Sequence, residues 1–517
     1  MKEVETSLQP RLVRALGPVM ATAVVIGTVI GSGIFQKPQR VADNIPYFGL
    51  VALVWILGGL LALMGSLAYA EVAVLYPRAG GNYVFLREGY GRLAGFLWGW
   101  VEFWIIRSAS LAALATLFTK SFYAVFCEVF GSSLGNQWLG YWPQKLVTVA
   151  VILGLALVNI RGVRWGGVLQ LFITIVKVCS LLGLILLPFI VQALELPRSS
   201  TAPPRTENLA PWWPSWSDFH ISGFISALLA VLWAYHGWMN IAPVAEEVTH
   251  PQRNIPLALL TGVGTLIVLY LGTNLSYSLV LTQAEMKGMR DPTPEETARL
   301  VSTAPAASER NASSSDRTVA IGYCRRLLGS AGVGLAAAAI MCSVFGALNG
   351  NLLVAPRQLY AMGQDGMAPR ALGRIHPTYR TPAWAIVVFA VWASLLVLGA
   401  AALTRLQLLP EDKDHFDILT DFAMFGAVIF ETMAVTSIFV FRRRYPDAPR
   451  PYRCLGYPVV PALYVILPSL ILGNMFVKQR TEALIGVGFI ALGALVYFIV
   501  FPASGPEAPV PKGPQPS

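Results

Sequence analysis

The chain has 517 residues, of which 55% are hydrophobic and only 13% are Asp, Glu, Lys or Arg. Soluble proteins carry about 25% charged residues, so this composition excludes an ordinary aqueous globule. Disorder is excluded as well, because a disordered chain combines low hydrophobicity with high charge. The composition therefore indicates a protein that crosses a membrane many times.

Twelve apolar stretches are long enough to cross the bilayer, since a helical span needs about 20 mostly apolar residues. They are continuous rather than alternating, which predicts an all-α protein and not a β-barrel. A polar segment, 1–14, precedes the first stretch, which lacks the cleavage pattern of a signal peptide; a Pro-rich tail, 502–517, follows the last. The spans lie near residues 15–37, 46–75, 92–127, 143–160, 165–193, 222–248, 256–283, 325–362, 382–404, 415–443, 457–477 and 480–501.

The net charge of +10 is distributed unequally between the two sides of the membrane. With the N-terminus in the cytoplasm, the inner segments carry 19 basic and 9 acidic residues, and the outer segments carry 17 and 16. Basic residues collect on the cytoplasmic side of membrane proteins, so twelve spans place both termini in the cytoplasm. Because the basic residues are dispersed over many short loops, we expect no nucleic-acid partner.

The first and sixth spans are interrupted in a similar way. Residues 27–33 read GTVIGSG, and each glycine weakens a helix by about 1 kcal/mol. Residues 236–243 read HGWMNIAP and lie at mid-membrane depth. Two such interruptions, at the starts of successive groups of five spans, indicate a transporter with inverted repeats and a binding site at the membrane midplane.

The interruptions predict the class of substrate. Unwinding a helix frees N–H groups at the start of one half-helix and C=O groups at the end of the other. The N–H end attracts a carboxylate and the C=O end an ammonium group. Two breaks that face each other therefore suit a zwitterion such as an α-amino acid, and they leave its side chain open.

Several motifs then occur in the order typical of one family. Residues 27–35 read GTVIGSGIF, the stretch 69–83 contains YAE and YPRAGGNY, and residues 246–256 read EEVTHPQRNIP. The stretch 348–360 contains LNGN and PRQLY. Together these motifs resemble the amino acid–polyamine–organocation (APC) superfamily, in its L-type amino-acid transporter branch, over about residues 12–480.

The resemblance implies a LeuT-like fold that works by alternating access, with discontinuous helices 1 and 6. Its five-plus-five inverted repeat would place repeat one at about 15–193 and repeat two at about 222–443. Accessory helices would follow at about 457–501, within one transporter domain, 15–501.

The resemblance also implies a substrate site at the two breaks. The N–H groups around Ser32 and Gly33 would hold the carboxylate, and the carbonyls of Val29, Trp233 and His236 would take the ammonium group. Trp233 stands where the family has an aromatic gate. The full set of implied substrate-binding residues is Val29, Ile30, Gly31, Ser32, Gly33, Trp233, Ala234 and His236.

Lys177 is the most informative charge in the apolar core. It lies about twelve residues into the fifth span, or roughly 18 Å along a helix, and an ionisable group at such depth indicates a function. In Na⁺-coupled relatives of this fold, a sodium ion ties span 1 to span 8. The resemblance implies that Lys177 replaces that cation, which predicts Na⁺ independence; a proton-coupling role for the same lysine stays open.

His236 departs from the family pattern, since many L-type members have glycine there. It is either a satisfied polar side chain in a wet cavity or a histidine that contacts substrate and senses pH. Glu246 and Glu247 end the sixth span near several arginines, which predicts an inner-gate ion pair.

Other charges within the spans receive structural interpretations. Glu102 and Arg107 in the third span are expected to pair with each other or with neighbours. Asp421 and Glu431 in the tenth span are expected to be solvated from a vestibule. Five scattered cysteines without a CxxC pair predict free thiols and no metal site.

These observations predict a secondary amino-acid transporter, an exchanger or permease, that needs neither Na⁺ nor a cofactor. H⁺-coupled symport and polyamine transport are the narrower alternatives; a polyamine would require acidic residues along the midplane. The alternative of a different class is a membrane enzyme built around His236, but the chain contains no HExxH motif.

The sequence also bears on the protein's partners and on the membrane in which it lies. Eukaryotic relatives pair with a heavy-chain glycoprotein through an external cysteine, whereas Cys127, the nearest candidate, falls inside or at the end of the third span. We therefore expect no such partner. We also expect the chain to lie in the lipid bilayer of a bacterial inner membrane.

Overall fold

The computed structural model describes residues 12–194, 204–215, 219–289, 318–406, 415–478 and 480–501, and its regular elements there are helices. The α-helices are α1 Pro18–Val29, α2 Gly33–Asn44, α3 Phe48–Leu75, α4 Asn82–Tyr90, α5 Arg92–Val101, α6 Ser108–Phe130, α7 Ser132–Trp138, α8 Tyr141–Ile160, α9 Val163–Ala193, α10 Ile221–Tyr235, α11 Pro251–Val280, α12 Gln283–Gly288, α14 Val319–Leu328, α15 Ser330–Gln364, α16 Ala383–Arg405, α17 His415–Arg444, α18 Val459–Lys478 and α19 Arg480–Val500. The other helical elements are the π-helix η1 Glu102–Arg107 and the 3-10 helices η2 Thr206–Leu209, η4 Trp238–Glu247 and η6 Arg370–Gly373.

The number of membrane spans agrees with the sequence prediction. In the described residues, eleven helical segments are long and apolar enough to cross a bilayer. The pair α1 and α2, bent by 40° at a short break, makes a twelfth. The all-α polytopic fold is therefore confirmed, whereas the inverted-repeat relation between its halves stays a prediction.

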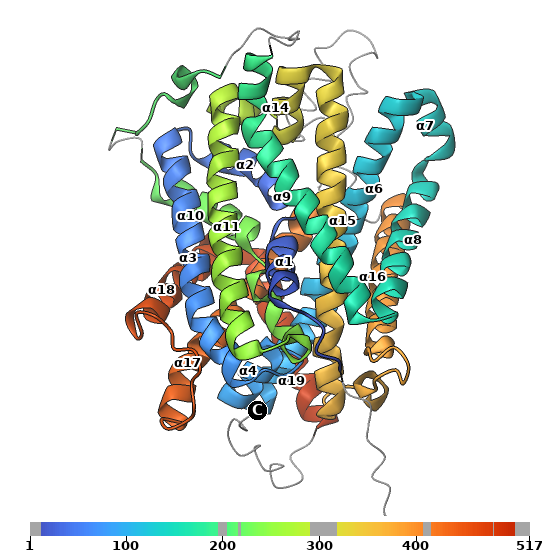
Figure 1. Cartoon of the computed structure of the whole chain (residues 1–517), viewed down its shortest axis with the longest axis vertical. Helices are drawn as coiled ribbons and strands as arrows, with labels where there is room; N and C mark the ends of the chain where they lie inside the picture. The colour runs from blue at the N-terminus through green and yellow to red at the C-terminus, as the bar shows by residue number, and fades with distance from the viewer. Residues whose placement is uncertain are drawn as a thin grey trace, which may run out of the picture.

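The helices form one elongated bundle (Figure 1). Helices α7 and α14 lie at one end, which we call the α14 end, and α4 lies at the other, the α4 end. Helix α1 lies in the middle of the bundle, where it packs against α9, α11 and α15. Helix α2 continues from α1 toward the α14 end.

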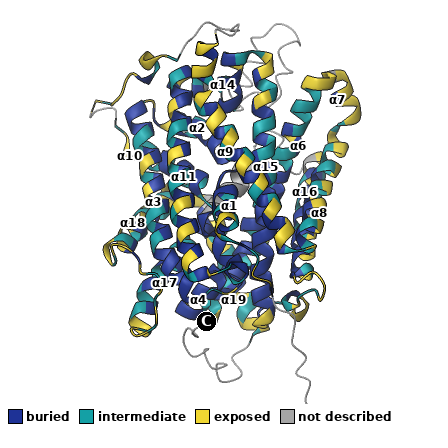
Figure 2. Ribbon diagram, in the orientation of Figure 1, coloured by how far each residue is buried: buried dark blue, intermediate teal, exposed yellow. Residues whose placement is uncertain are grey.

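Burial follows the position of each helix in the bundle. Residues near the axis are buried, and exposed ones lie on the outer faces (Figure 2). Many of these exposed side chains are large and apolar, among them Phe172, Val268 and Val477. An outer surface of this kind suits contact with lipid rather than water.

The first span breaks where its sequence is least suited to a helix. Helix α1 ends at Val29, Ile30 has an extended ψ of 92°, and α2 begins at Gly33. A glycine is required at position 33 because a Cβ there would lie 2.7 Å from Cα of Ala234. The break therefore permits a close approach between the first and sixth spans.

The sixth span breaks for a different reason. Helix α10 ends at Tyr235, and Gly237 follows with φ of 112°, a left-handed conformation that favours glycine. Pro243 has no N–H to donate to the carbonyl of Met239, so an α-helix cannot continue through this stretch. The 3-10 helix η4 forms instead and runs to Glu247.

The five cysteines are free, in agreement with the sequence prediction. Cys454, between α17 and α18, is buried, and its N–H donates to Glu71 at 2.7 Å. Burial, assisted by the Glu71 carboxylate, raises the pKa of the Cys454 thiol to about 11. This thiol therefore stays protonated and unreactive at neutral pH.

Candidate functional site

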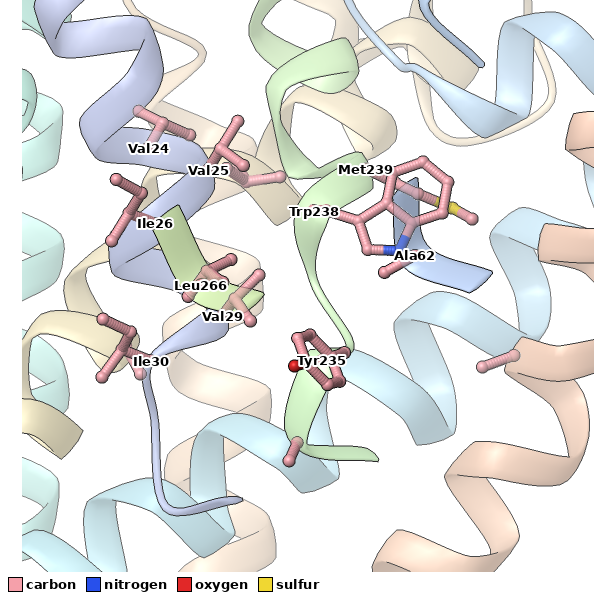
Figure 3. Close-up of a cluster of buried hydrophobic side chains, with 14 of the residues drawn as sticks. Val24, Val25, Ile26, Val29, Ile30, Ala62, Tyr235, Trp238, Met239 and Leu266 are labelled. Atoms are coloured by element: carbon pink, nitrogen blue, oxygen red, sulfur yellow. The ribbon is translucent and has the colours of Figure 1, made fainter. Parts of the chain in front are cut away.

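A cavity lies where the two helix breaks meet. The cavity has a volume of about 60 Å³, which is enough for several water molecules. Figure 3 shows both breaks as non-helical segments of the chain, one after Ile30 and one between Tyr235 and Trp238. The lining residues come from the first, third, sixth, eighth and tenth spans: Thr28, Val29, Gly31, Ser32, Gly33, Ile106, Arg107, Ser110, Leu114, Trp233, His236, Gly237, Asn240, Ala347, Asn351 and Ala427.

Six of the eight residues predicted for the substrate site line this cavity: Val29, Gly31, Ser32, Gly33, Trp233 and His236. The other two, Ile30 and Ala234, are buried behind its wall. The carbonyl of Ile30 accepts a bond from Lys177, and that of Ala234 accepts one from Tyr270. The structure thus brings all eight to one place, six as lining and two as backing.

One side of the cavity presents backbone N–H groups. Helix α2 begins here, and its first N–H groups have no partner within the helix. Phe35 and Gln36 donate to the carbonyl of Ser32 at 3.2 and 3.1 Å. In the described part of the chain, the N–H groups of Ser32 and Gly33 have no acceptor. With the partial positive charge of a helix start, they form a place for an anionic group.

The carbonyls at the end of α1 are held by a buried ammonium group. Lys177 on α9 is 1% exposed, and its Nζ donates to the carbonyls of Gly27 at 2.7 Å and Ile30 at 2.5 Å. Ser343 on α15 donates to the carbonyl of Gly31 at 3.0 Å. A cation at a helix C-terminus opposes the negative end of the helix dipole. Lys177 and Ser343 thus tie the first span to the fifth and eighth.

Tyr270 on α11, which the sequence analysis missed, joins the two breaks. Its buried hydroxyl lies 3.2 Å from the carbonyl of Val29 and 3.1 Å from that of Ala234. A hydroxyl in the middle of an apolar span was the available signal, because a buried hydroxyl needs a partner. Thr28 adds a second link, since its Oγ1 donates to the carbonyl of Gly237 at 3.2 Å.

We expect Tyr270→Phe to lower stability, because it removes a donor shared by two buried carbonyls. The cost should be about 1–3 kcal/mol, seen as a lower Tm of the purified protein and slower amino-acid uptake. Tyr277→Phe is the matched control on the same helix, since the buried Tyr277 hydroxyl has no partner among the described residues. Equal effects of the two substitutions would contradict the role of Tyr270 in joining the two breaks.

Glu102 and Arg107 form the ion pair that the sequence predicted. In a π-helix such as η1, each N–H donates to the carbonyl five residues earlier, so residues five apart lie on one face. The side chains of Glu102 and Arg107 therefore lie together, and Arg107 Nε donates to Glu102 at 2.6 Å. The guanidinium also donates to Asn351 at 3.0 Å and to Asn240. Arg107 is therefore more than a structural partner, because it gives the cavity wall a cation with polar neighbours.

His236 contacts Glu431 across the cavity wall. Its Nε2 lies 2.7 Å from Glu431 Oε1 on α17. The side chain of Glu431, for which solvation from a vestibule was expected, is 13% exposed and pairs with His236. The side chain of Asp421 lies outside the part that the structure describes.

Trp233 lies between a histidine and a lysine. Its ring stacks on that of His236, with 5° between the planes and 6.1 Å between the centroids. Lys37 on α2 places its Nζ 5.6 Å from the centre of the Trp233 ring. The indole thus covers the cavity on the side of α2.

The predicted ion pair of Glu247 lies at the α4 end. Arg357 on α15 donates to Glu247 through Nε at 3.1 Å and Nη2 at 3.2 Å, and both side chains are fully buried. Glu246 instead accepts the N–H of Ala79 at 3.1 Å. These contacts join the end of η4 to α15 and to the segment before α4.

We expect Gly33→Ala to push the two breaks apart. Its Cβ would meet the backbone of Ala234 at 2.7 Å, and such overpacking costs about 1–3 kcal/mol. Gly264→Ala on α11 is the control, because a Cβ there meets nothing within 4 Å. Thermal unfolding and uptake rates should both separate the two variants; an unaffected Gly33→Ala protein would contradict the close approach.

Among the described residues, no group of three or more His, Cys, Asp or Glu side chains gathers closely enough to hold a metal ion. The charged groups near the cavity instead contact one another or backbone carbonyls.

A polytopic helical bundle with a polar cavity between two interrupted spans has the form of a secondary transporter. The chain belongs to the amino acid permease family, because the family model described as "Amino acid permease" matches residues 16–509. This match confirms the resemblance inferred from the motifs.

Relatives of known function are similar over nearly the whole chain. The serine/threonine exchanger SteT of Bacillus subtilis is 29% identical over 489 residues, which cover 94% of this chain and 97% of the exchanger. The human cystine/glutamate transporter is 27% identical, over 90% of this chain and 80% of its own length. The human b(0,+)-type amino acid transporter 1 is also 27% identical, over 96% and 88%. These relatives are transporters by name, in agreement with amino-acid transport rather than catalysis.

Proposed function

We propose that this protein is a Na⁺-independent secondary amino-acid transporter, an exchanger or permease, that binds its substrate at the two helix breaks. The observation that carries the proposal is the cavity itself, where free N–H groups of α2 and carbonyls at the ends of α1 and α10 come together. This is the arrangement that a zwitterion requires.

Each end of the substrate has its own group of contacts. The N–H groups of Ser32 and Gly33 bind the α-carboxylate, assisted by the Ser32 hydroxyl. The α-ammonium group binds the carbonyls of Val29, Trp233 and His236. Two of these carbonyls already accept one hydrogen bond, from Tyr270 and from the His236 N–H. A carbonyl has two lone pairs, so each can accept another.

Lys177 supports the absence of a sodium requirement. Its ammonium group contacts two carbonyls of the first span beside Ser343 of α15. The same position between spans 1 and 8 is where a resident cation would tie the two together. A fixed cation makes a dissociable one unnecessary.

Two gates enclose the substrate in this proposal. Trp233, with Lys37 over its ring, closes the side of α2. Glu247 with Arg357, and Glu246 with the segment before α4, close the α4 end. In this proposal that end faces the cytoplasm, together with both termini, in a bacterial inner membrane; the excess of basic residues in the loops on that side supports this orientation.

Exchange is supported by one relative, which is named a serine/threonine exchanger. Transport without a heavy-chain partner is supported by the position of Cys127, the cysteine nearest to where such a partner would attach. Cys127 is half-buried in α6, and its Sγ faces α7, where a Cβ at Gly135 would lie 2.3 Å from it.

Reconstitution in liposomes tests the proposal. Labelled serine, threonine and a panel of other amino acids are offered with and without internal substrate, in sodium or in choline buffer. We expect saturable uptake that is the same in both buffers. Uptake only with internal substrate would establish exchange; no saturable uptake, or uptake that requires sodium, would overturn the proposal.

A further inference from the structure

The contact between His236 and Glu431 joins the sixth and tenth spans, whose helices α10 and α17 otherwise meet mainly through α3 and α18, on which both pack. His236 lies in the break after α10, and α10 packs mainly against α2 and α3. Glu431 lies on α17, which packs mainly against α18, α4, α3 and η1. A relative movement of the sixth and tenth spans would therefore change the 2.7 Å separation of Nε2 and Oε1.

The pair is largely withdrawn from solvent but can be reached from the cavity. The side chain of His236 is 19% exposed and lines the cavity, whereas that of Glu431 is 13% exposed and lies behind it. Ala427, one helical turn before Glu431, also lines the cavity. Water or substrate in the cavity therefore meets the imidazole first.

The surrounding charges leave Glu431 dependent on His236. Glu102 is compensated by Arg107, with which it shares a hydrogen bond. Ionisable groups close to the pair are Glu102 on η1, Tyr69 on α3 and Tyr464 on α18. Arg107 on η1 lines the same cavity as His236, and Lys37 on α2 lies over the neighbouring ring of Trp233. In the described chain, Glu431 makes its ion pair with His236.

A buried carboxylate is costly unless a positive charge or a proton compensates it. Neutral imidazole beside carboxylate leaves one uncompensated negative charge. One added proton gives an imidazolium whose Nε2–H donates to Oε1, and the pair becomes neutral overall. Imidazole is also the side chain that ordinarily changes charge between pH 5 and 8.

We propose that the His236–Glu431 pair is a proton-binding site of the transport cycle, so that one proton crosses the membrane with each amino acid. The proposal rests on the transport function proposed above, in its permease mode, and specifies its coupling. In a strict exchanger, the protons carried in the two directions would cancel. The pair takes up a proton from water on one side while it is closed. It returns that proton to water on the other side when the sixth and tenth spans separate and the carboxylate becomes hydrated.

The accumulation of substrate against a pH gradient tests this site, because it does not depend on the transport rate. With one proton per amino acid and the membrane voltage clamped, a gradient of one pH unit supports an accumulation of about tenfold. We expect wild-type liposomes that are alkaline inside to approach this ratio. Glu431→Gln, which keeps the shape of the side chain but cannot hold the charge, should give a ratio near one while amino-acid exchange continues.

Glu128→Gln is the matched control, since Glu128 is exposed on α6; its ratio should equal that of the wild type. A second measurement needs no variant: a pH-sensitive dye inside wild-type liposomes should report acidification when serine or another transported amino acid is added outside. A wild-type protein that exchanges amino acids without responding to the gradient or acidifying the interior would overturn the inference alone. A Glu431→Gln protein that accumulates substrate like the wild type would also overturn the inference of a proton site, without affecting the proposed transport function. A wild-type protein that moves no amino acid would overturn the proposed function as well.

Discussion

Lys177→Met is expected to slow amino-acid uptake at least about tenfold. The substitution removes the donor of two hydrogen bonds from a charged group to the carbonyls of Gly27 and Ile30. Bonds of this kind contribute about 1.5–3 kcal/mol each, and 1.4 kcal/mol corresponds to a factor of ten in an equilibrium. The initial rate of labelled amino-acid uptake into liposomes measures the effect.

Two further variants make this result specific. Lys120→Met removes an exposed lysine from α6 and should leave uptake unchanged. Gly346→Ala keeps Lys177 but displaces it, because a Cβ at position 346 would lie 2.5 Å from Cε of Lys177. It should therefore slow uptake as well. Wild-type rates in both Lys177→Met and Gly346→Ala would show that this cation does not hold the first span for transport.

Arg357→Gln is expected to destabilise the protein by about 3–5 kcal/mol, because it leaves the fully buried Glu247 carboxylate without its partner. The Tm of the purified protein should fall accordingly. Replacing both residues, as in Arg357→Leu with Glu247→Leu, should recover part of the loss, since it removes the uncompensated charge.

The pair between Arg326 and Glu285 is the control for this prediction. It has a similar separation, 2.8 Å, but its side chains are 34% and 36% exposed. Arg326→Gln should therefore cost no more than about 1 kcal/mol. If the buried and exposed pairs had equal effects on Tm, the buried pair would not be a main support of the α4 end.

The spans and their breaks were predictable because both are local properties of the sequence. A span needs only length and apolarity, and a break needs only residues that a helix tolerates poorly, such as those at 27–33 and 236–243. The depth of Lys177 within an apolar stretch likewise identified it as a residue that requires partners. Its two carbonyl acceptors then lay in the span that the breaks had already singled out.

The charged contacts around the cavity were not predictable in the same way. His236 and Glu431 are 195 positions apart, and Arg107 lies 244 positions from Asn351. Such pairs depend on how distant helices pack, which hydrophobic periodicity does not report. The pair of Glu102 and Arg107 was expected, because the two residues are close in sequence, but the π-helical turn of η1 that places them on one face was not.

The isolated bridge between Leu16 and Val248 has a mechanical consequence. Ala15 and Leu16 both donate to the carbonyl of Glu247, and Thr249 donates to that of Leu16, each at 2.9 Å. The chain entering α1 is thereby fastened to the chain leaving η4, so neither can slide past the other without breaking main-chain bonds. Helix α1 and the 3-10 helix η4, one from each broken span, are therefore expected to move as one rigid unit. A substrate bound at both breaks, as proposed above, would move together with that unit.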